Sequence, residues 1–266
     1  MTLGISGVSF GFETKSGRAD SGHLDFDLQE LVEDLDKPLK KAKSGFAVFV
    51  DEMQALDGEF TAALLATQHK ANQRGWPFHV CGAGLPNLPG RLADVRSYAE
   101  RLFEYRAIGP LDDPAARLAL TQPAERSGAV YTPEALGLLL AAARGYPYFL
   151  QEFGSAIWQS APDSPFTAAD ARSALAVGRA ALDNGFFPAR WSRATPAERS
   201  YLRAMAEDGD AGSAPSDISL RLGKTLKALS PVRARLVAKG LVYAPRPGAI
   251  AFTVPGMADY INRQSP

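Results

Sequence analysis

Cysteine and histidine are scarce in this chain of 266 residues. Cys81 is the single cysteine, which excludes a disulfide within the chain and a zinc site built from several cysteines. His23, His69 and His79 are scattered along the sequence, so metal catalysis by a histidine cluster finds no support. Long apolar runs are also missing, because none approaches the ~18 residues of a membrane-spanning helix. The first residues lack the basic and apolar regions of a secretory signal, so we expect a cytoplasmic protein with no membrane partner.

A net charge of one sign is absent as well, since the chain has 29 Lys and Arg residues and 29 Asp and Glu residues. The charges are unevenly distributed, however. Residues 187–266 carry 12 basic and 6 acidic side chains, whereas residues 1–186 carry 17 basic and 23 acidic ones. This asymmetry favours a polyanionic partner for the C-terminal segment. The hydrophobic share of 46% excludes a wholly disordered chain, because it is large enough for a packed core.

Strand and helix patterns alternate in the N-terminal part of the chain. Residues 46–50, Phe-Ala-Val-Phe-Val, form a continuous apolar run, which predicts a strand buried on both faces in a parallel sheet. A helix is predicted over 58–73, then a strand over 77–84 in which we expect Cys81 to be buried. Further strands are predicted over 3–12 and 103–108, and a helix over 26–43 that Pro38 should bend or end early. This order predicts an α/β fold with parallel pairing.

Helical patterns take over after Asp112. Four helices are predicted over 112–128, 132–145, 148–161 and 167–185. The last segment predicts three short helices over 195–209, 216–223 and 230–240, with Ser230 as N-cap of the third and Pro231 in its first turn. Two short strands follow, over 241–245 and 249–254. Three helices followed by a two-stranded ribbon is the order of a winged helix-turn-helix.

Two adjacent carboxylates follow the strand predicted over 46–50. Asp51 and Glu52 come at its carboxyl end, where open α/β sheets bind their ligands. Four apolar residues followed by Asp-Glu resemble the Walker B motif of P-loop NTPases. The alternative is a strand that ends in two solvated acidic residues.

Three further features strengthen this resemblance through their order and spacing. Residues 77–89 contain a strand followed by Gly-Leu-Pro-Asn-Leu-Pro, which resembles the sensor 1 region of AAA+ and STAND-type ATPases. Gly145-Tyr146-Pro147 resembles the sensor 2 motif, and the predicted winged helix follows it. From Val8 to Tyr260 the chain therefore resembles AAA+/STAND-type P-loop ATPases of the bacterial and archaeal branch related to origin-recognition ATPases. The resemblance implies a P-loop NTPase core over 1–110, a helical lid over 111–186 and a winged helix-turn-helix domain over 187–266.

The resemblance also implies roles for individual residues in binding ATP and Mg²⁺. Asp51 would help to hold Mg²⁺, and Glu52 would orient or activate the attacking water. Guanidinium groups suit phosphates, which makes Arg101 a candidate for the nucleotide side, although most arginines on a helix face are simply solvated. The implied cofactor-binding residues are Asp51, Gly82, Arg101, Gly145 and Pro147.

The departure from the family pattern concerns the phosphate loop. No Walker A sequence, G-x-x-x-x-G-K-[ST], precedes Asp51, where the family has it. The Gly223-Lys224-Thr225 triplet lies in the predicted winged helix and has Ile218 in place of the first glycine. The chain thus resembles a family member that starts late, with an incomplete parallel sheet and no useful affinity for ATP. We expect either an open sheet edge or pairing of the strands at 77–84 and 103–108, and, with an open edge, self-association or poor solubility.

Basic residues gather on the third helix and the wing of the C-terminal segment. A helix-turn-helix places its second helix in the major groove of duplex DNA, and flanking basic groups neutralise phosphates. The candidate DNA-binding residues are Lys224, Lys227, Arg233, Arg235, Lys239 and Arg246. Three functions stay open: a nucleotide switch fused to a DNA-binding domain, a non-catalytic DNA-binding regulator or adaptor that uses the ATPase body as a scaffold, and a protein-interaction module without nucleic acid.

Overall fold

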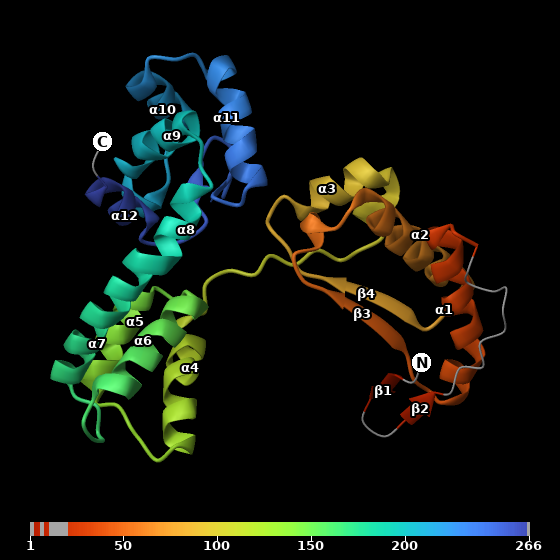
Figure 1. Cartoon of the computed structure of the whole chain (residues 1–266), viewed down its shortest axis with the longest axis horizontal. Coiled ribbons are helices and arrows are strands. Elements are labelled where there is room, and N and C mark those ends of the chain that lie inside the picture. The colour runs from red at the N-terminus through yellow and green to blue at the C-terminus, as the bar shows by residue number, and fades with distance from the viewer. Residues whose placement is uncertain (1–2, 6–7, 11–20, 265–266) are drawn as a thin grey trace. The chain divides into compact units, whose positions relative to one another are not determined.

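The computed structural model describes residues 3–5, 8–10 and 21–264. The chain divides into two compact units, Met1–Arg106 and Ala107–Pro266. Figure 1 labels the α-helices of both units and the strands β1–β4 of the first. Among the described residues, no helix is both long enough and apolar enough to cross a membrane.

The first unit is built on a parallel pair of strands. β3 (Phe46–Val50) and β4 (Phe78–Gly82) pair in register from Phe46 opposite Phe78 to Val50 opposite Gly82. The connection between them is α2 (Gly58–Arg74), which starts with Asp57 accepting a hydrogen bond from the Phe60 N–H and ends at Gly75 in the left-handed conformation. Both strands, the helix between them and the parallel pairing confirm the sequence prediction.

Only one face of this sheet is buried, which corrects the prediction of strands covered on both sides. Phe78 and Val80 pack with residues of α1 (Leu24–Lys41), α2 and α3 (Leu88–Val95), and these helices lie on one side of the sheet (Figure 1). The alternate residues point away from that layer. Phe49 is 80% exposed, and Cys81 is exposed as well, although we expected it to be buried.

The free edge of β4 is occupied by a side chain. The Phe46 N–H binds the Pro77 carbonyl. The backbone N–H and C=O groups of the odd-numbered residues of β4 therefore point toward β3, and those of the even-numbered residues point toward the free edge. There, buried Gln68 of α2 accepts a hydrogen bond from the Val80 N–H at 2.7 Å and donates one to the Phe78 carbonyl at 3.3 Å. No strand of the described chain pairs on this edge. Residues 103–108 are not a strand, so that prediction was wrong, and η2 (Ser97–Arg101) precedes them.

Two N-terminal predictions also need correction. In place of one strand over 3–12, β1 (Leu3–Ile5) and β2 (Val8–Phe10) form a separate antiparallel pair, and residues 11–12 lie outside the described part of the chain. Of the two outcomes predicted at Pro38, a bend or an end, the end is wrong, because α1 continues to Lys41. The proline has no N–H to donate, but its carbonyl still accepts the ordinary helical hydrogen bond from the Ala42 N–H at 3.0 Å.

The second unit begins with the four predicted helices: α4 (Asp113–Arg126), α5 (Pro133–Ala143), α6 (Pro147–Ser160) and α7 (Ala168–Ala181). The side chains of Asp112, Thr132 and Thr167 cap α4, α5 and α7 by accepting a backbone hydrogen bond in the first turn. From α7 the backbone continues as a π-helical turn, η3 (Leu182–Phe186), directly into α8 (Phe187–Ser192). The boundary predicted at 186/187 therefore falls inside a continuous helical run.

The remainder of this unit contains the three predicted helices and the ribbon. They are α9 (Pro196–Ala206), α10 (Pro215–Leu222), α11 (Leu226–Ala238), β5 (Val242–Tyr243) and β6 (Ala251–Phe252), with η4 (Gly209–Ala211) before α10 and α12 (Met257–Arg263) at the end. α11 starts earlier than predicted, because Thr225 and not Ser230 is its N-cap and accepts a hydrogen bond from the Ala228 N–H. Pro231 accordingly lies inside the helix.

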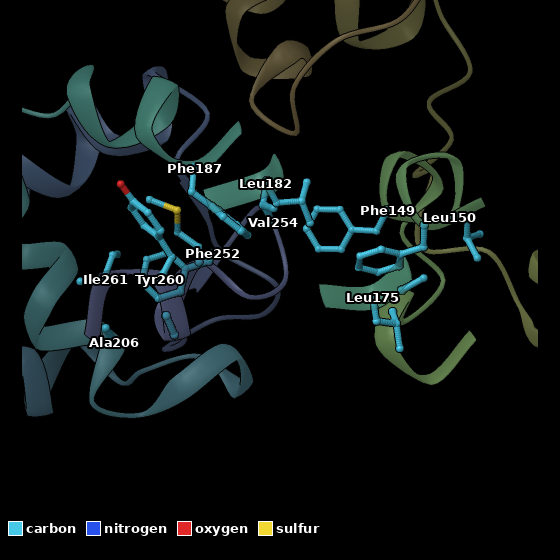
Figure 2. Packing of buried hydrophobic residues seen from close by; sticks show 14 of the residues in the cluster. Phe149, Leu150, Leu175, Leu182, Phe187, Ala206, Phe252, Val254, Tyr260 and Ile261 are labelled. Atoms are coloured by element: carbon cyan, nitrogen blue, oxygen red, sulfur yellow. The ribbon is translucent and has the colours of Figure 1, made fainter. Parts of the chain in front are cut away.

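One hydrophobic core runs through the whole second unit. It extends from Ala116 in α4 to Ile261 in α12. Figure 2 shows Phe149 and Leu175 at one end of this core, Tyr260 and Ile261 at the other, and Leu182 and Phe187 between them. The segments predicted as lid and winged helix therefore share a single packed interior.

Candidate functional site

The predicted Walker B carboxylates lie at the carboxyl end of β3. Asp51 and Glu52 are both exposed. Asp51 accepts a hydrogen bond from the Glu52 N–H through Oδ1 at 2.9 Å. Glu52 adopts a left-handed backbone conformation, with φ 51° and ψ 40°, which turns the chain sharply into η1 (Met53–Ala55). A non-glycine residue held in this conformation immediately after a strand marks a constrained loop.

Gln54 holds this loop against the loop that follows β4. Its amide nitrogen donates to the Glu52 carboxylate, and its Oε1 accepts from the Leu85 N–H at 3.1 Å. A second link joins the Met53 N–H to the Ala83 carbonyl at 2.9 Å. Gln54 was not predicted from the sequence, although its place two residues after Glu52 puts it at the same carboxyl end of the sheet.

Gly82 lies beside this loop, so the structure brings it together with the acidic pair. A Cβ atom at Gly82 would lie 2.3 Å from the Met53 sulfur, and one at Gly84 would lie 2.3 Å from Gln54 Oε1. Both contacts are with the far ends of flexible side chains, so a larger residue at Gly82 or Gly84 would displace Met53 or Gln54 from its place in this loop. Arg101 is exposed at the end of η2, and within the described ranges its side chain makes no ion pair or hydrogen bond with Asp51 or Glu52.

The residues at this edge fit only half of a Mg²⁺-ATP site. Two exposed carboxylates are suitable oxygen donors for Mg²⁺. Across residues 3–5, 8–10 and 21–264, however, no group of three His, Cys, Asp or Glu side chains is placed to hold a metal ion. The sequence also lacks the glycine-rich phosphate loop before Asp51. The acidic pair accordingly fits the metal side of the site, and the triphosphate side is not matched.

Gly145 and Pro147 belong to the second compact unit, whereas Asp51, Gly82 and Arg101 belong to the first. Gly145 has φ +72°, and a Cβ atom there would lie 2.4 Å from the Leu111 carbonyl oxygen. The Leu111 N–H also binds the Gly145 carbonyl at 2.8 Å. This close backbone approach requires glycine for structural reasons, and Pro147 occupies the first turn of α6.

Two of the candidate DNA-binding residues face a buried carboxylate. Glu198 has no exposed surface, and it accepts from Lys239 Nζ at 2.6 Å and Arg235 Nε at 3.2 Å. Glu198 also completes a capping box with Thr195 at the start of α9. Burial alone would raise the pKa of Glu198, but the hydrogen bonds from Lys239 and Thr195 outweigh it and lower the pKa to about 2.

Lys239 also makes a second structural contact, with Arg193, which was not predicted from the sequence. It lies at the carboxyl end of α11, and Arg193 lies at the carboxyl end of α8. Lys239 Nζ donates to the Arg193 carbonyl and Arg193 Nη2 donates to the Lys239 carbonyl, both at 2.8 Å. Each cation thus satisfies the C-terminal carbonyl of the other helix. The other candidates, Lys224, Lys227, Arg233 and Arg246, are exposed.

Known structures and one protein family are similar to this chain. A Walker-type ATPase of Pyrococcus abyssi has a similar structure, with a TM-score of 0.63 and 16% sequence identity, over 88% of this chain and 68% of that protein. The RuvB Holliday junction branch migration motor of Thermotoga maritima gives a TM-score of 0.46 and 14% identity, over 88% of this chain and 76% of that one. Residues 184–261 match a family described as a domain of unknown function, DUF8462. No curated protein matches the sequence.

The similarity to the Walker-type ATPase supports the P-loop NTPase fold, which the acidic pair and the parallel strands predicted. The fold of the chain is similar to that of a Walker-type ATPase. The family match covers nearly the whole segment predicted as a winged helix.

Proposed function

We propose that this chain is an AAA+/STAND-type ATPase-family protein in which a helical lid (111–186) couples an ATPase core to a C-terminal winged helix (187–266) that binds duplex DNA. We further propose that this polypeptide does not itself hydrolyse ATP. The observation that carries the proposal is the position of Asp51 and Glu52 at the carboxyl end of a parallel strand, in a fold similar to that of a Walker-type ATPase.

The backbone pairing of the last segment supports a winged helix. Between α9 and α10, Ser213 and Ile250 form an antiparallel bridge with hydrogen bonds of 2.8 and 2.9 Å in the two directions. Ile250 directly precedes β6, so this bridge adds a third short strand to the β5–β6 ribbon. The resulting order is helix, strand, helix, helix, and two strands joined by a turn.

Lost phosphate contacts support the absence of ATPase activity. A phosphate loop supplies several charge-assisted hydrogen bonds, at about 1.5–3 kcal/mol each. Without roughly four of them, binding is weaker by about 6–12 kcal/mol, whereas a micromolar ligand has only about 8 kcal/mol in total. Arg101, Gly145 and Pro147 keep their proposed place on the nucleotide side, and Asp51 its place as a ligand of Mg²⁺, in a complete form of the site.

Duplex DNA is the proposed partner of α11 and the wing. Lys224 and Lys227 lie at the start of α11, and Arg246 lies in the turn between β5 and β6. These residues and Arg233 are exposed and suited to phosphates. Arg235 and Lys239 contribute less directly, since both also serve Glu198.

A second candidate is a non-catalytic DNA-binding regulator or adaptor whose ATPase body is a scaffold. Gln68 favours it, because the amide of this residue occupies the edge of β4 and leaves the sheet edge satisfied without a further strand. Self-association through the incomplete sheet, which was expected at an open edge, is therefore proposed at the uncovered sheet face instead, where Phe49 is exposed.

Calorimetry with Mg-ATP and salt-dependent binding of duplex DNA test these proposals separately. We expect no ATP binding at micromolar concentration, and DNA binding that weakens as salt rises. Lys224→Glu combined with Lys227→Glu should abolish DNA binding, whereas Arg117→Glu with Arg126→Glu on exposed positions of α4 changes the net charge equally and should not. Micromolar ATP binding would refute the first proposal, and equal loss in both double variants would refute the second.

A further inference from the structure

A cavity of about 410 Å³ opens in the second unit between the lid helices and α12. Its size is at the lower end of the ~300–1,000 Å³ typical of small-molecule pockets. The floor is apolar and aromatic, because Phe149, Phe153 and Phe187 line it and all three are buried. Figure 2 shows Phe149, Leu182 and Phe187 next to one another in this part of the core.

The rim of the cavity is charged, and most of its charges are already paired. Arg263 binds both oxygens of Asp183, at 2.7 and 2.8 Å. Arg144 binds Asp210 at 2.6 Å, and Asp210 also accepts from the Gly256 N–H. The first ion pair joins α12 to η3, and the second joins the end of α5 to η4, which also holds the loop before α12 through the Gly256 N–H.

Two further charged residues of opposite sign lie at the rim. Arg179 in the last turn of α7 and Asp259 in the first turn of α12 both line the cavity and are exposed. Neither side chain has an ion-pair or hydrogen-bond partner within the described part of the chain, and the two do not pair with each other although they border one cavity. A guanidinium group can pair with a carboxylate and a carboxylate with an ammonium group, so the rim of this cavity offers a charged partner to each end of a small zwitterion.

The wall of the cavity next to Arg179 contains an irregular helical turn. η3 is a π-helical turn, and its residues Leu182 and Asp183 line the cavity. Such turns cost helical hydrogen-bond geometry and are frequent at functional sites. This supports a ligand site at the point where the lid helices continue into the C-terminal segment.

We propose that this cavity binds a free α-amino acid with an aromatic or branched apolar side chain. The carboxylate of the ligand pairs with Arg179, its ammonium group pairs with Asp259, and its side chain packs on Phe149, Phe153 and Phe187. An anion alone leaves Asp259 without a partner, and an amine alone leaves Arg179 without one. Since Arg179 lies in the lid and Asp259 in α12, the ligand joins the two segments and stabilises the unit.

The test is calorimetry and thermal unfolding of the full chain with L-phenylalanine and L-leucine. Glycine lacks the side chain, 3-phenylpropionate lacks the ammonium group and phenethylamine lacks the carboxylate, so all three should bind about tenfold or more weakly than L-phenylalanine. Saturating L-phenylalanine should raise the Tm of the second unit in proportion to the logarithm of its concentration.

Variants assign the two ends of the ligand. Arg179→Gln and Asp259→Asn should each weaken L-phenylalanine binding about tenfold or more. Arg172→Gln, on α7 but paired with Glu134, and Asp217→Asn, on α10, should leave it unchanged. Arg179→Gln should not affect phenethylamine. Ala142→Trp, which fills the cavity from α5, should abolish binding while circular dichroism reports an intact fold. Binding that is absent for every probe at millimolar concentration, or equal for L-phenylalanine and 3-phenylpropionate, would overturn the proposal.

Discussion

Lys239 Nζ lies 2.6 Å from Oε2 of Glu198, a carboxylate that is fully buried at the start of α9. The distance joins residues 41 positions apart and connects the carboxyl end of α11 to the α8–α9 turn. A buried charge is tolerated only when it is paired and hydrogen-bonded, and Glu198 meets this condition through Lys239, Arg235 and the Thr195 N–H. Arg235 and Lys239, which were predicted from the sequence to bind DNA, thus also stabilise the second unit.

Lys239→Met should destabilise the second unit by about 2–3 kcal/mol, because it removes a hydrogen bond to a buried carboxylate. Urea unfolding followed by circular dichroism measures the change. Arg172→Met is the matched control, since it removes a cation from an exposed pair with Glu134 and should change stability by less than about 0.5 kcal/mol. Equal effects of the two variants would show that the Glu198 site does not stabilise the unit.

The lowered pKa of Glu198 makes this stabilisation dependent on pH. The folded pKa is about 2 and the ordinary value is 4.5, so the unfolded chain takes up the proton first as the pH falls. The contribution of Glu198 is therefore complete above about pH 5 and is lost progressively as the pH falls from 4.5 towards 2. In the Glu198→Gln variant the side chain at this position cannot take up a proton in this pH range. The stability difference between wild type and this variant should be constant from pH 8 to 6 and shrink between pH 4.5 and pH 3; a difference independent of pH would contradict the assignment.

Local patterns predicted most of the elements correctly. The apolar run over 46–50, the helical pattern over 58–73, and the Thr132 cap with Pro133 at the start of α5 are all signals contained in short stretches of sequence. The start of α11 was predicted too late, because Thr225 and Ser230 are both good N-cap residues. The turn after Thr225 is helical in the structure, and its Leu229 is buried in the core.

Burial and partners could not be predicted in the same way. Phe49 and Cys81 belong to apolar strands, but their exposure depends on whether a second layer covers that face of the sheet. The pairing of Arg235 with Glu198 spans 37 positions, and no spacing rule connects a capping-box glutamate to a later helix. The acidic pair was placed correctly at the sheet edge, whereas the loop contacts of Gln54 depend on a second strand end and are visible only in three dimensions.

Gln68→Met should expose the edge of β4 to association. The variant keeps the volume of the side chain but leaves the Val80 N–H and the Phe78 carbonyl without a partner, at about 1–3 kcal/mol for each buried group. We expect lower stability of the first unit and concentration-dependent association, since an unpaired strand edge is a template for further pairing. Light scattering and urea unfolding measure the two effects.

Gln73→Met is the control for that experiment. Gln73 lies on the same helix and is exposed, with its amide next to His69 Nε2. The change of composition is the same, but no strand backbone loses a partner. If both variants remain monomeric and equally stable, the Gln68 amide does not protect the sheet edge.

Gly145→Ala should destabilise the second unit whether or not nucleotide is present. The residue has φ +72°, which costs an alanine about 1 kcal/mol or more, and the new Cβ would lie 2.4 Å from the Leu111 carbonyl oxygen. To relieve this clash the backbone would have to move, which would disturb the hydrogen bond from the Leu111 N–H to the Gly145 carbonyl. Gly137→Ala on the preceding helix is the opposite case, because nothing lies within 4 Å of its Cβ and the position is an exposed helix interior. That variant should stabilise by about 0.5–1 kcal/mol. Thermal unfolding of both proteins without ligand decides the matter. A loss of stability at Gly145 in the absence of ATP identifies the glycine as necessary for the α5–α6 turn itself, whereas unchanged stability would contradict this structural role.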